Sequence, residues 1–180
     1  AELVCYGAVR AGTSVIYSDG STRGAVASKL TIGMLRKAAR ALEKNRATRV
    51  TSVVKAGPNF GTSPVESAYC VFIHTDCESD VRDLAGFTKR VEYGSAIKPM
   101  HDREIGACEQ FRFVTSPLFN PFLAAGAAVG STGMVADNAT NIDVYPVIVM
   151  GEDAWGQCSL KGHGYTGISP TVIPAHEKNH

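Results

Sequence analysis

The run Tyr69-Cys-Val-Phe-Ile73 is the clearest strand pattern in the sequence. Its residues are continuously apolar, without the alternation of apolar and polar side chains that marks a strand with one face in water. Such a strand is covered on both faces, as at a central position of a mixed sheet. Together with the elements around it, it predicts an α+β fold.

One amphipathic helix is predicted over Leu30–Asn45, because apolar residues recur at helical spacing while basic residues occupy the other face. Thr31 can cap its start and Asn45 its end. The apolar face comprises Leu30, Met34, Leu35, Ala38 and Leu42, and the basic face comprises Arg36, Lys37, Arg40 and Lys44.

Two further strands are expected at Phe111–Thr115 and Val144–Met150. Pro146 lies near the start of the second and suits the end or edge of a strand better than its centre. Shorter β-prone runs are Leu3–Tyr6, Ser14–Tyr17 and Cys158–Leu160.

Turn chemistry separates these elements. Gly57–Pro64 is a loop by composition. After Ile73, Thr75 or Asp76 can cap a short helix that ends at Gly86. That helix runs through Ser79, Val81 and Leu84.

The cysteines indicate reduced thiols. The chain has 180 residues, 44% of them hydrophobic. A chain of this size buries roughly 70% of its unfolded surface, so its stability needs no disulfide or metal. Its five cysteines are odd in number and form no C-x-x-C pair, which argues against a disulfide framework or structural zinc. With no secretory signal pattern, a cytosolic origin is expected. The cysteines are Cys5, Cys70, Cys77, Cys108 and Cys158.

A membrane span is not expected. The one suspect is the 24-residue uncharged stretch Phe113–Ala136. Prolines and glycines interrupt it, and its apolar members are mostly Ala. It is interpreted as a buried or subunit-facing loop.

Charge is uneven along the chain although the net charge is only +1. Between Arg36 and Lys55 seven basic residues stand against Glu43 alone, a local balance of +6. Such a cluster can contact phosphate, but it can equally be a solvated face or meet an acidic neighbouring subunit, and these last readings are favoured. The seven are Arg36, Lys37, Arg40, Lys44, Arg46, Arg49 and Lys55.

Candidate catalytic chemistry is sparse. His74, Asp76 and Cys77 place three metal-ligand types at the end of the central strand, but no second cluster supplies the converging ligands that a metal site needs. His101–Glu104 is interpreted as an exposed loop or subunit contact rather than an acid/base pair. Neither a phosphate loop nor a nucleophile elbow is present, so no catalytic, cofactor-binding or metal-binding residue is assigned.

Three segments in order carry a resemblance. The first, Tyr69–Leu84, is a strand ending in His followed by a helix with Asp-Val-Arg-Asp-Leu. The second, Glu104–Ser116, contains Ile-Gly and Arg-Phe-Val, and the third, Val144–Gly162, runs into Gly-Glu-Asp-Ala-Trp-Gly. Over roughly 31–173 the chain resembles the major capsid protein family of tailed phages of the N-four type, which has the Hong Kong 97 capsid fold.

The resemblance implies a structural protein of the virion, assembled in the host bacterial cytoplasm into an icosahedral head around double-stranded DNA. It implies no enzyme activity and no cofactor. The partners implied are copies of the chain itself, packaged DNA bound non-specifically, and decoration, portal or scaffolding proteins, with no membrane.

The same resemblance divides the chain into three parts. Residues 1–48 are expected to be an arm and peripheral-lobe segment, 49–150 the axial lobe with its mixed sheet and flanking helices, and 151–180 the return to the peripheral lobe. The chain is then expected to be the interior and later part of a subunit.

Two alternatives stay open on the residues alone. One is a metal-dependent hydrolase that uses His74, Asp76 and Cys77. The other is a small basic nucleic-acid-binding module that uses Arg36, Lys37, Arg40 and Lys44.

Overall fold

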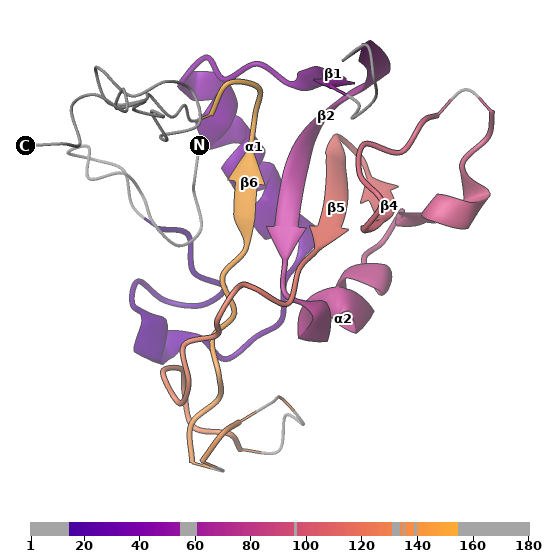
Figure 1. Ribbon diagram of the computed structural model, residues 1–180. Coiled ribbons are helices and arrows are strands. Elements are labelled where there is room, and N and C mark those ends of the chain that lie inside the picture. The colour runs from indigo at the N-terminus through magenta and orange to yellow at the C-terminus, as the bar shows by residue number, and fades with distance from the viewer. Residues whose placement is uncertain are drawn as a thin grey trace, which may run out of the picture.

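The computed structural model describes residues 15–54, 61–95, 97–130, 134, 136–138 and 140–154. These residues form an α+β fold in which a mixed sheet carries few helices (Figure 1). The elements in chain order are a 3-10 turn (Arg23–Ala25), α1 (Ile32–Lys44), β1 (Val50–Val54), β2 (Thr62–Ile73), a 3-10 turn (Thr75–Cys77), α2 (Glu78–Arg82), β3 (Thr88–Lys89), a 3-10 turn (Arg90–Glu92), β4 (Glu104–Cys108), β5 (Phe111–Thr115) and β6 (Ile148–Met150).

Strand β2 organises the sheet. The strand order is β1-β2-β5-β4-β3, and β6 also pairs with β2. The β2–β5 pair is parallel, with Tyr69 opposite Phe111. The pairs of β2 with β1 and β6, and of β4 with β3 and β5, are antiparallel. Because β5 occupies one edge of β2, strands β1 and β6 follow each other along its other edge.

The predicted central strand is confirmed, but it is longer than the apolar run. Residues 68–73 of β2 are buried or half-buried between β5 and β6, whereas residues 62–67 pair with β1 alone and are largely exposed. The prediction that Thr62–Pro64 is loop was wrong, because pairing with β1 extends the strand. The part of that loop at 57–60 lies outside the described residues.

The predicted helix is confirmed as α1. Thr31 and Asn45 occupy its cap positions, although the Thr31 side chain makes no capping hydrogen bond. The chain leaves the helix through Arg46, whose φ of 60° lies in the left-handed region. Four residues of α1 are buried, namely Leu35, Ala38, Ala39 and Leu42.

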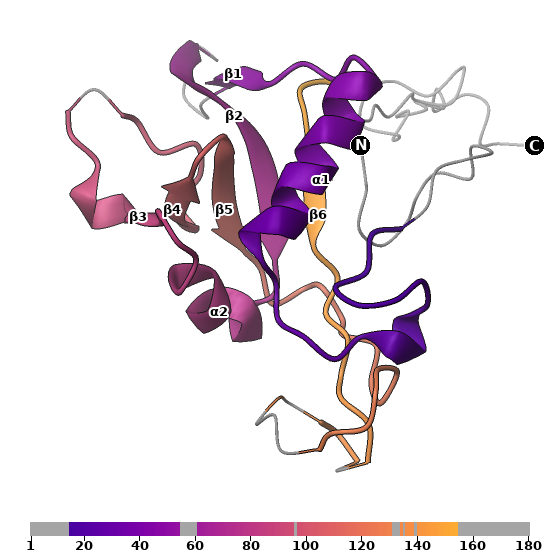
Figure 2. The same ribbon diagram turned by 180° about the vertical axis from the view of Figure 1, so that it is seen from behind.

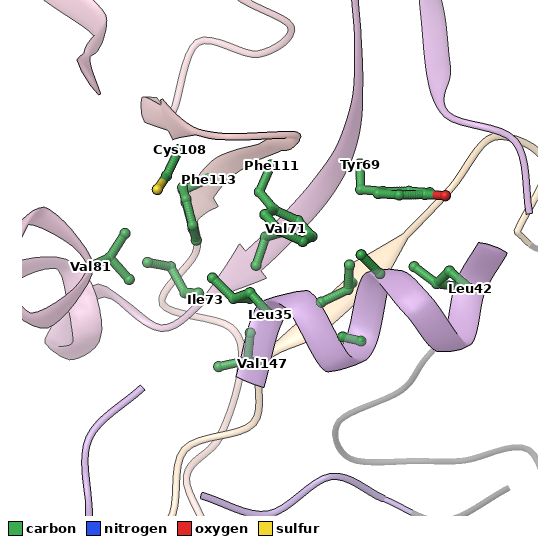
Figure 3. Packing of buried hydrophobic residues seen from close by; sticks show 13 residues of the cluster. Leu35, Leu42, Tyr69, Val71, Ile73, Val81, Cys108, Phe111, Phe113 and Val147 are labelled. Carbon is green, nitrogen blue, oxygen red and sulfur yellow. The ribbon is translucent and has the colours of Figure 1, made fainter. Parts of the chain in front are cut away.

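The helices cover one face of the sheet (Figure 2). One apolar cluster joins α1, α2 and the strands, and Figure 3 shows Leu35 and Val81 directed toward Ile73 and Phe113. Burial of this face in a single core is the main stabilising contribution expected for the fold. The other members of the cluster include Leu42, Tyr69, Val71, Cys108, Phe111, Val147 and Val149.

The short helix after β2 is confirmed with a different cap. The His74 ring accepts a hydrogen bond from the Asp76 backbone N–H at 3.1 Å, so His74 caps the turn rather than Thr75 or Asp76. Gly86 follows the helix with a φ of +81°, a conformation that favours glycine.

The later strands are confirmed in part. β5 spans the predicted Phe111–Thr115, and all five of its residues are buried. In the predicted strand Val144–Met150 only Ile148–Met150 is regular, while Val144 forms an isolated bridge with Phe122. Residues 15–17 form no strand, and Leu3–Tyr6 and Cys158–Leu160 lie outside the described residues.

The uncharged stretch forms an excursion from the sheet. Backbone pairing of Phe122 with Val144 and of Ala128 with Asn141 holds its outgoing and returning limbs together. Figure 1 shows this excursion extending away from the end of β5. Within the ranges described, no helix is long and apolar enough to cross a bilayer.

The expected boundary at residue 48 falls between α1 and β1. Residues of α1 share a core with the sheet strands. The division into lobes is not tested by this arrangement and stays a prediction.

Candidate interaction surfaces and a buried charge cluster

His74, Asp76 and Cys77 are neighbours, but each takes part in local structure. The Asp76 carboxylate accepts a hydrogen bond from the Tyr145 hydroxyl at 2.8 Å, and the His74 ring packs on the Tyr145 ring with centroids 5.2 Å apart. Among the described residues, no three His, Cys, Asp or Glu side chains are placed to hold a metal ion. The structure therefore gives the hydrolase alternative no metal site in this part of the chain.

The cysteines of the described core are free thiols. Burial raises the pKa of Cys70 and of Cys77 to about 12, and nearby carboxylates add to the effect. Burial also raises the pKa of Cys108. The nucleophilic and metal-binding form of cysteine is the thiolate, so these thiols are poor nucleophiles and ligands at neutral pH.

A buried ion pair lies on the sheet face opposite the helices. The Arg112 side chain of β5 is only 2% exposed and the Glu104 side chain of β4 is fully buried, with 3.5 Å between the guanidinium and the carboxylate. Arg112 also donates to the Lys98 carbonyl at 2.6 Å and reaches the exposed carboxylate of Glu66 at 3.3 Å. Its guanidinium lies 5.7 Å from the centre of the Tyr93 ring, within cation–π range.

Glu104 completes the cluster with two further hydrogen bonds. Its carboxylate accepts from the Tyr93 hydroxyl at 2.7 Å and from the Met100 N–H at 2.5 Å. The cluster therefore ties the segment 93–103 to the sheet. Burial and hydrogen bonding to Glu104 raise the pKa of Tyr93 well above its usual value, so its hydroxyl stays a donor.

The prediction that His101–Glu104 is an exposed loop was wrong for Glu104. Its neighbours His101, Asp102 and Arg103 are exposed, but Glu104 begins β4 and is 3% exposed. A sequence signal existed: Arg112 stands between two phenylalanines of a strand expected to be buried, so it points to the opposite face and requires a carboxylate there.

The basic cluster around α1 is partly neutralised by this chain. Arg36 binds both oxygens of Glu109, and this pairing lowers the pKa of Glu109 and raises that of Arg36. Arg49 binds Glu43 at 3.0 Å and Gln110 at 2.5 Å. The remaining described cations of the cluster are exposed and form no ion pair with another described residue; these are Lys37, Arg40, Lys44 and Arg46.

An acidic surface lies on and beside α2. Four carboxylates occur within 76–83, and Arg82 is the one cation in that interval. Lys29 pairs with Asp80 at 2.7 Å and Arg82 with Glu78 at 2.5 Å, leaving Asp83 exposed without a described ion-pair partner. The acidic set is Asp76, Glu78, Asp80 and Asp83.

A mostly apolar cavity of about 270 Å³ adjoins this acidic surface. Its walls come from the segment before α1, from the start of α2 and from the outgoing and returning limbs of the uncharged stretch after β5. Asp76 and Asp80 belong to its lining, and the Arg23 guanidinium covers the Phe122 ring at 3.7 Å. The apolar lining includes Val26, Leu30, Met34, Phe122, Ile142 and Val147.

Several large apolar side chains are exposed on loops and edges. Val91 is 89% exposed and Leu118 84% exposed. Isolated exposed apolar residues are normal on a monomer, so these two carry no function by themselves.

Comparison of the sequence with protein-family models finds no matching family, and no curated protein matches it.

Proposed function

We propose that this chain is part of a major capsid protein of a tailed bacteriophage, with the Hong Kong 97 capsid fold. Its role is structural: many copies pack into capsomers and close an icosahedral head around the DNA genome. The work of such a protein is done by its interfaces, and it needs neither a catalytic residue nor a cofactor.

The observation that carries the proposal is the meeting of the three segments on which the resemblance rests. They are far apart in the sequence, yet β2 comes from the first, β4 and β5 from the second, and β6 from the third. These strands are direct neighbours, since β2 pairs with both β5 and β6, and β4 pairs with β5. The family resemblance thus concerns one contiguous structural unit rather than scattered motifs.

The distribution of polar groups also supports a structural role. The groups best suited to chemistry are engaged in local contacts: His74 caps a turn, Asp76 binds Tyr145, and Glu104 pairs with Arg112. Among the described residues, exposed charged side chains remain available on α1 and on α2. Surfaces of this kind set orientation and partner choice in protein association.

The proposal extends to partners and location. The virion capsid is the site of the mature protein, and assembly takes place in the host bacterial cytoplasm. Copies of the chain are the main partner, packaged DNA is contacted without sequence preference, and decoration, portal or scaffolding proteins complete the head.

The test is the mass and shape of particles formed by the full-length chain, measured by light scattering and negative-stain electron microscopy. Closed shells or capsomer rings are expected. A stable monomer at high protein concentration, with and without scaffolding protein, would overturn the proposal.

The basic module remains the second candidate because four exposed cations lack a described ion-pair partner. It predicts DNA binding by a monomer that falls steeply with salt and disappears when those charges are reversed. The particle measurement separates the two, because a monomeric module forms no particle under conditions in which it binds DNA.

A further inference from the structure

The two surface charges of the chain lie at different ends of the helix layer. Figure 2 shows α2 near the N-terminal end of α1, while the C-terminal end of α1 lies at the opposite end of the layer. The exposed cations Lys37, Arg40 and Lys44 run toward that far end. One copy therefore presents a basic surface and an acidic surface that cannot neutralise each other internally.

We propose that the basic surface of α1 (Lys37, Arg40, Lys44 and Arg46) docks on the acidic surface of α2 (Asp76, Glu78, Asp80 and Asp83) in the next copy of the chain. This inference rests on the proposed function, because it names the contact by which copies meet. Different surfaces pair in it, so it is a head-to-tail contact, which closes into a ring when the rotation between copies permits.

The spacing of the basic residues suits such a contact. Lys37 and Lys44 are seven residues apart on one helix, about 10 Å at the rise of an α-helix. Lys37, Arg40 and Lys44 are three and four residues apart, which places them on one side of the helix. They can therefore engage several carboxylates of one neighbouring surface together.

The acidic surface offers more than charge. The cavity of about 270 Å³ is lined by Asp76, Asp80 and Asp143 together with Arg23 and Lys29, and most of the remaining lining is apolar. Lys and Arg side chains bury their methylene stems along apolar surface while their charged ends bind carboxylates. With three carboxylates against two cations the lining is weakly acidic, so it fits a basic, long-chain partner better than it fits nucleic acid, whose phosphates the carboxylates would repel.

Charge complementarity within one sequence favours a second copy over DNA as the partner of α1. The chain already binds two cations of the same cluster with its own groups, Arg36 with Glu109 and Arg49 with Glu43. Its net charge is only +1, so it carries no general field toward a polyanion.

The test uses charge reversal and restoration in the full-length chain. The basic-surface variant carries Lys37→Glu, Arg40→Glu and Lys44→Glu. The acidic-surface variant carries Glu78→Lys and Asp83→Lys, which leaves Asp76 with Tyr145 and Asp80 with Lys29 but removes the ion-pair partner of Arg82. Each variant alone is expected to raise the protein concentration needed for assembly at least about tenfold, because like charges then face each other.

Restoration is the decisive arm. A chain that carries both sets of reversals is expected to assemble again near the wild-type concentration. The matched control carries Lys89→Glu, Lys98→Glu and Arg103→Glu, the same change in net charge at three exposed residues outside this contact. It is expected to assemble like the wild type.

Each outcome decides the matter. A wild type that forms no particles overturns the proposed function together with this contact. A wild type that assembles while the basic-surface variant assembles equally well overturns the contact alone, and loss of salt-sensitive DNA retention in that variant would assign α1 to DNA. If a reversal variant loses its circular dichroism signal, Arg40→Gln and Asp83→Asn are compared at low and high salt, and an unchanged assembly concentration for both overturns the contact.

Discussion

The two sides of β5 are buried in different surroundings, one apolar and one polar. On the helix side Phe111 and Phe113 pack in an apolar cluster with α1 and α2, and the Phe113 ring lies 6.1 Å from that of Phe87. On the opposite side Arg112 is equally buried, but it is held by an ion pair and a carbonyl. The apolar face tolerates apolar substitutions that conserve volume at modest cost, whereas the polar face depends on every member of its cluster.

The difference between the faces is also a difference in what they organise. The apolar face joins helices to strands and so forms the core. The polar face anchors the segment 93–103, whose described residues lie outside the apolar cluster. Loss of the first should unfold the protein, and loss of the second should release a surface segment as well as lower stability.

The largest effect is expected from Phe113→Ala, which removes a fully buried ring from the helix-side core. Such truncations cost about 3–5 kcal/mol of unfolding free energy. The measurement is urea denaturation followed by circular dichroism. Phe72→Ala is the matched control, since Phe72 is half-buried on the opposite face. An equal loss in both variants would remove the distinction between the faces.

Arg112→Met is expected to be next, at about 3 kcal/mol, because it leaves the Glu104 carboxylate buried without its cation. Adding Glu104→Gln should recover part of this loss, because the uncompensated charge is removed. Urea denaturation of the two single variants and the double variant gives the coupling. Losses that simply add would show that the pair is not energetically linked.

Tyr93→Phe isolates one hydrogen bond of the cluster. The hydroxyl donates to an ionised carboxylate at 2.7 Å, and loss of such a bond costs about 2 kcal/mol. Hydrogen exchange followed by mass spectrometry should show faster amide exchange in the segment 93–103, with exchange in β5 unchanged. Unaltered exchange there would mean that the cluster does not anchor the segment.

The pH dependence of stability supplies the fourth test. Burial raises the pKa of Cys70 from 9.0 to about 12, so the unfolded chain loses this proton first as pH rises. Stability from Cys70 is therefore complete below pH 9 and is lost progressively between pH 9 and 12, by about 1 kcal/mol at pH 10. Cys70→Val should lose less stability than the wild type between pH 8 and pH 10. Identical losses would contradict burial of the thiol as the cause.

Much of the fold follows from periodicity. The helical spacing of Leu35, Ala38 and Leu42 and the apolar run of β2 predicted one helix and one central strand, and both are present. Boundaries were less predictable. The exposed half of β2 exists because β1 pairs with it, a long-range contact that Thr62–Pro64 do not signal locally.

The polar features were predicted less well, because they depend on pairing between distant residues. Glu104 is charged and follows two other charged residues, so local composition indicated an exposed loop. Its burial becomes evident only when β4 pairs with β5 and brings it beside Arg112. Likewise, Arg36 and Arg49 belong to a basic run in the sequence, but the turn between β4 and β5 supplies partners for both through Glu109 and Gln110.

Hydrogen exchange of the full-length chain before and after assembly tests the central claim most directly, since it follows core and surface together. The amides of β5 and of residues 68–73 of β2 should be protected in both states, because the core is complete in one copy. New protection should appear on assembly at α1 and α2. Particles that leave both helices unchanged would contradict the contact proposed here, and a chain that forms no particles would contradict the structural role.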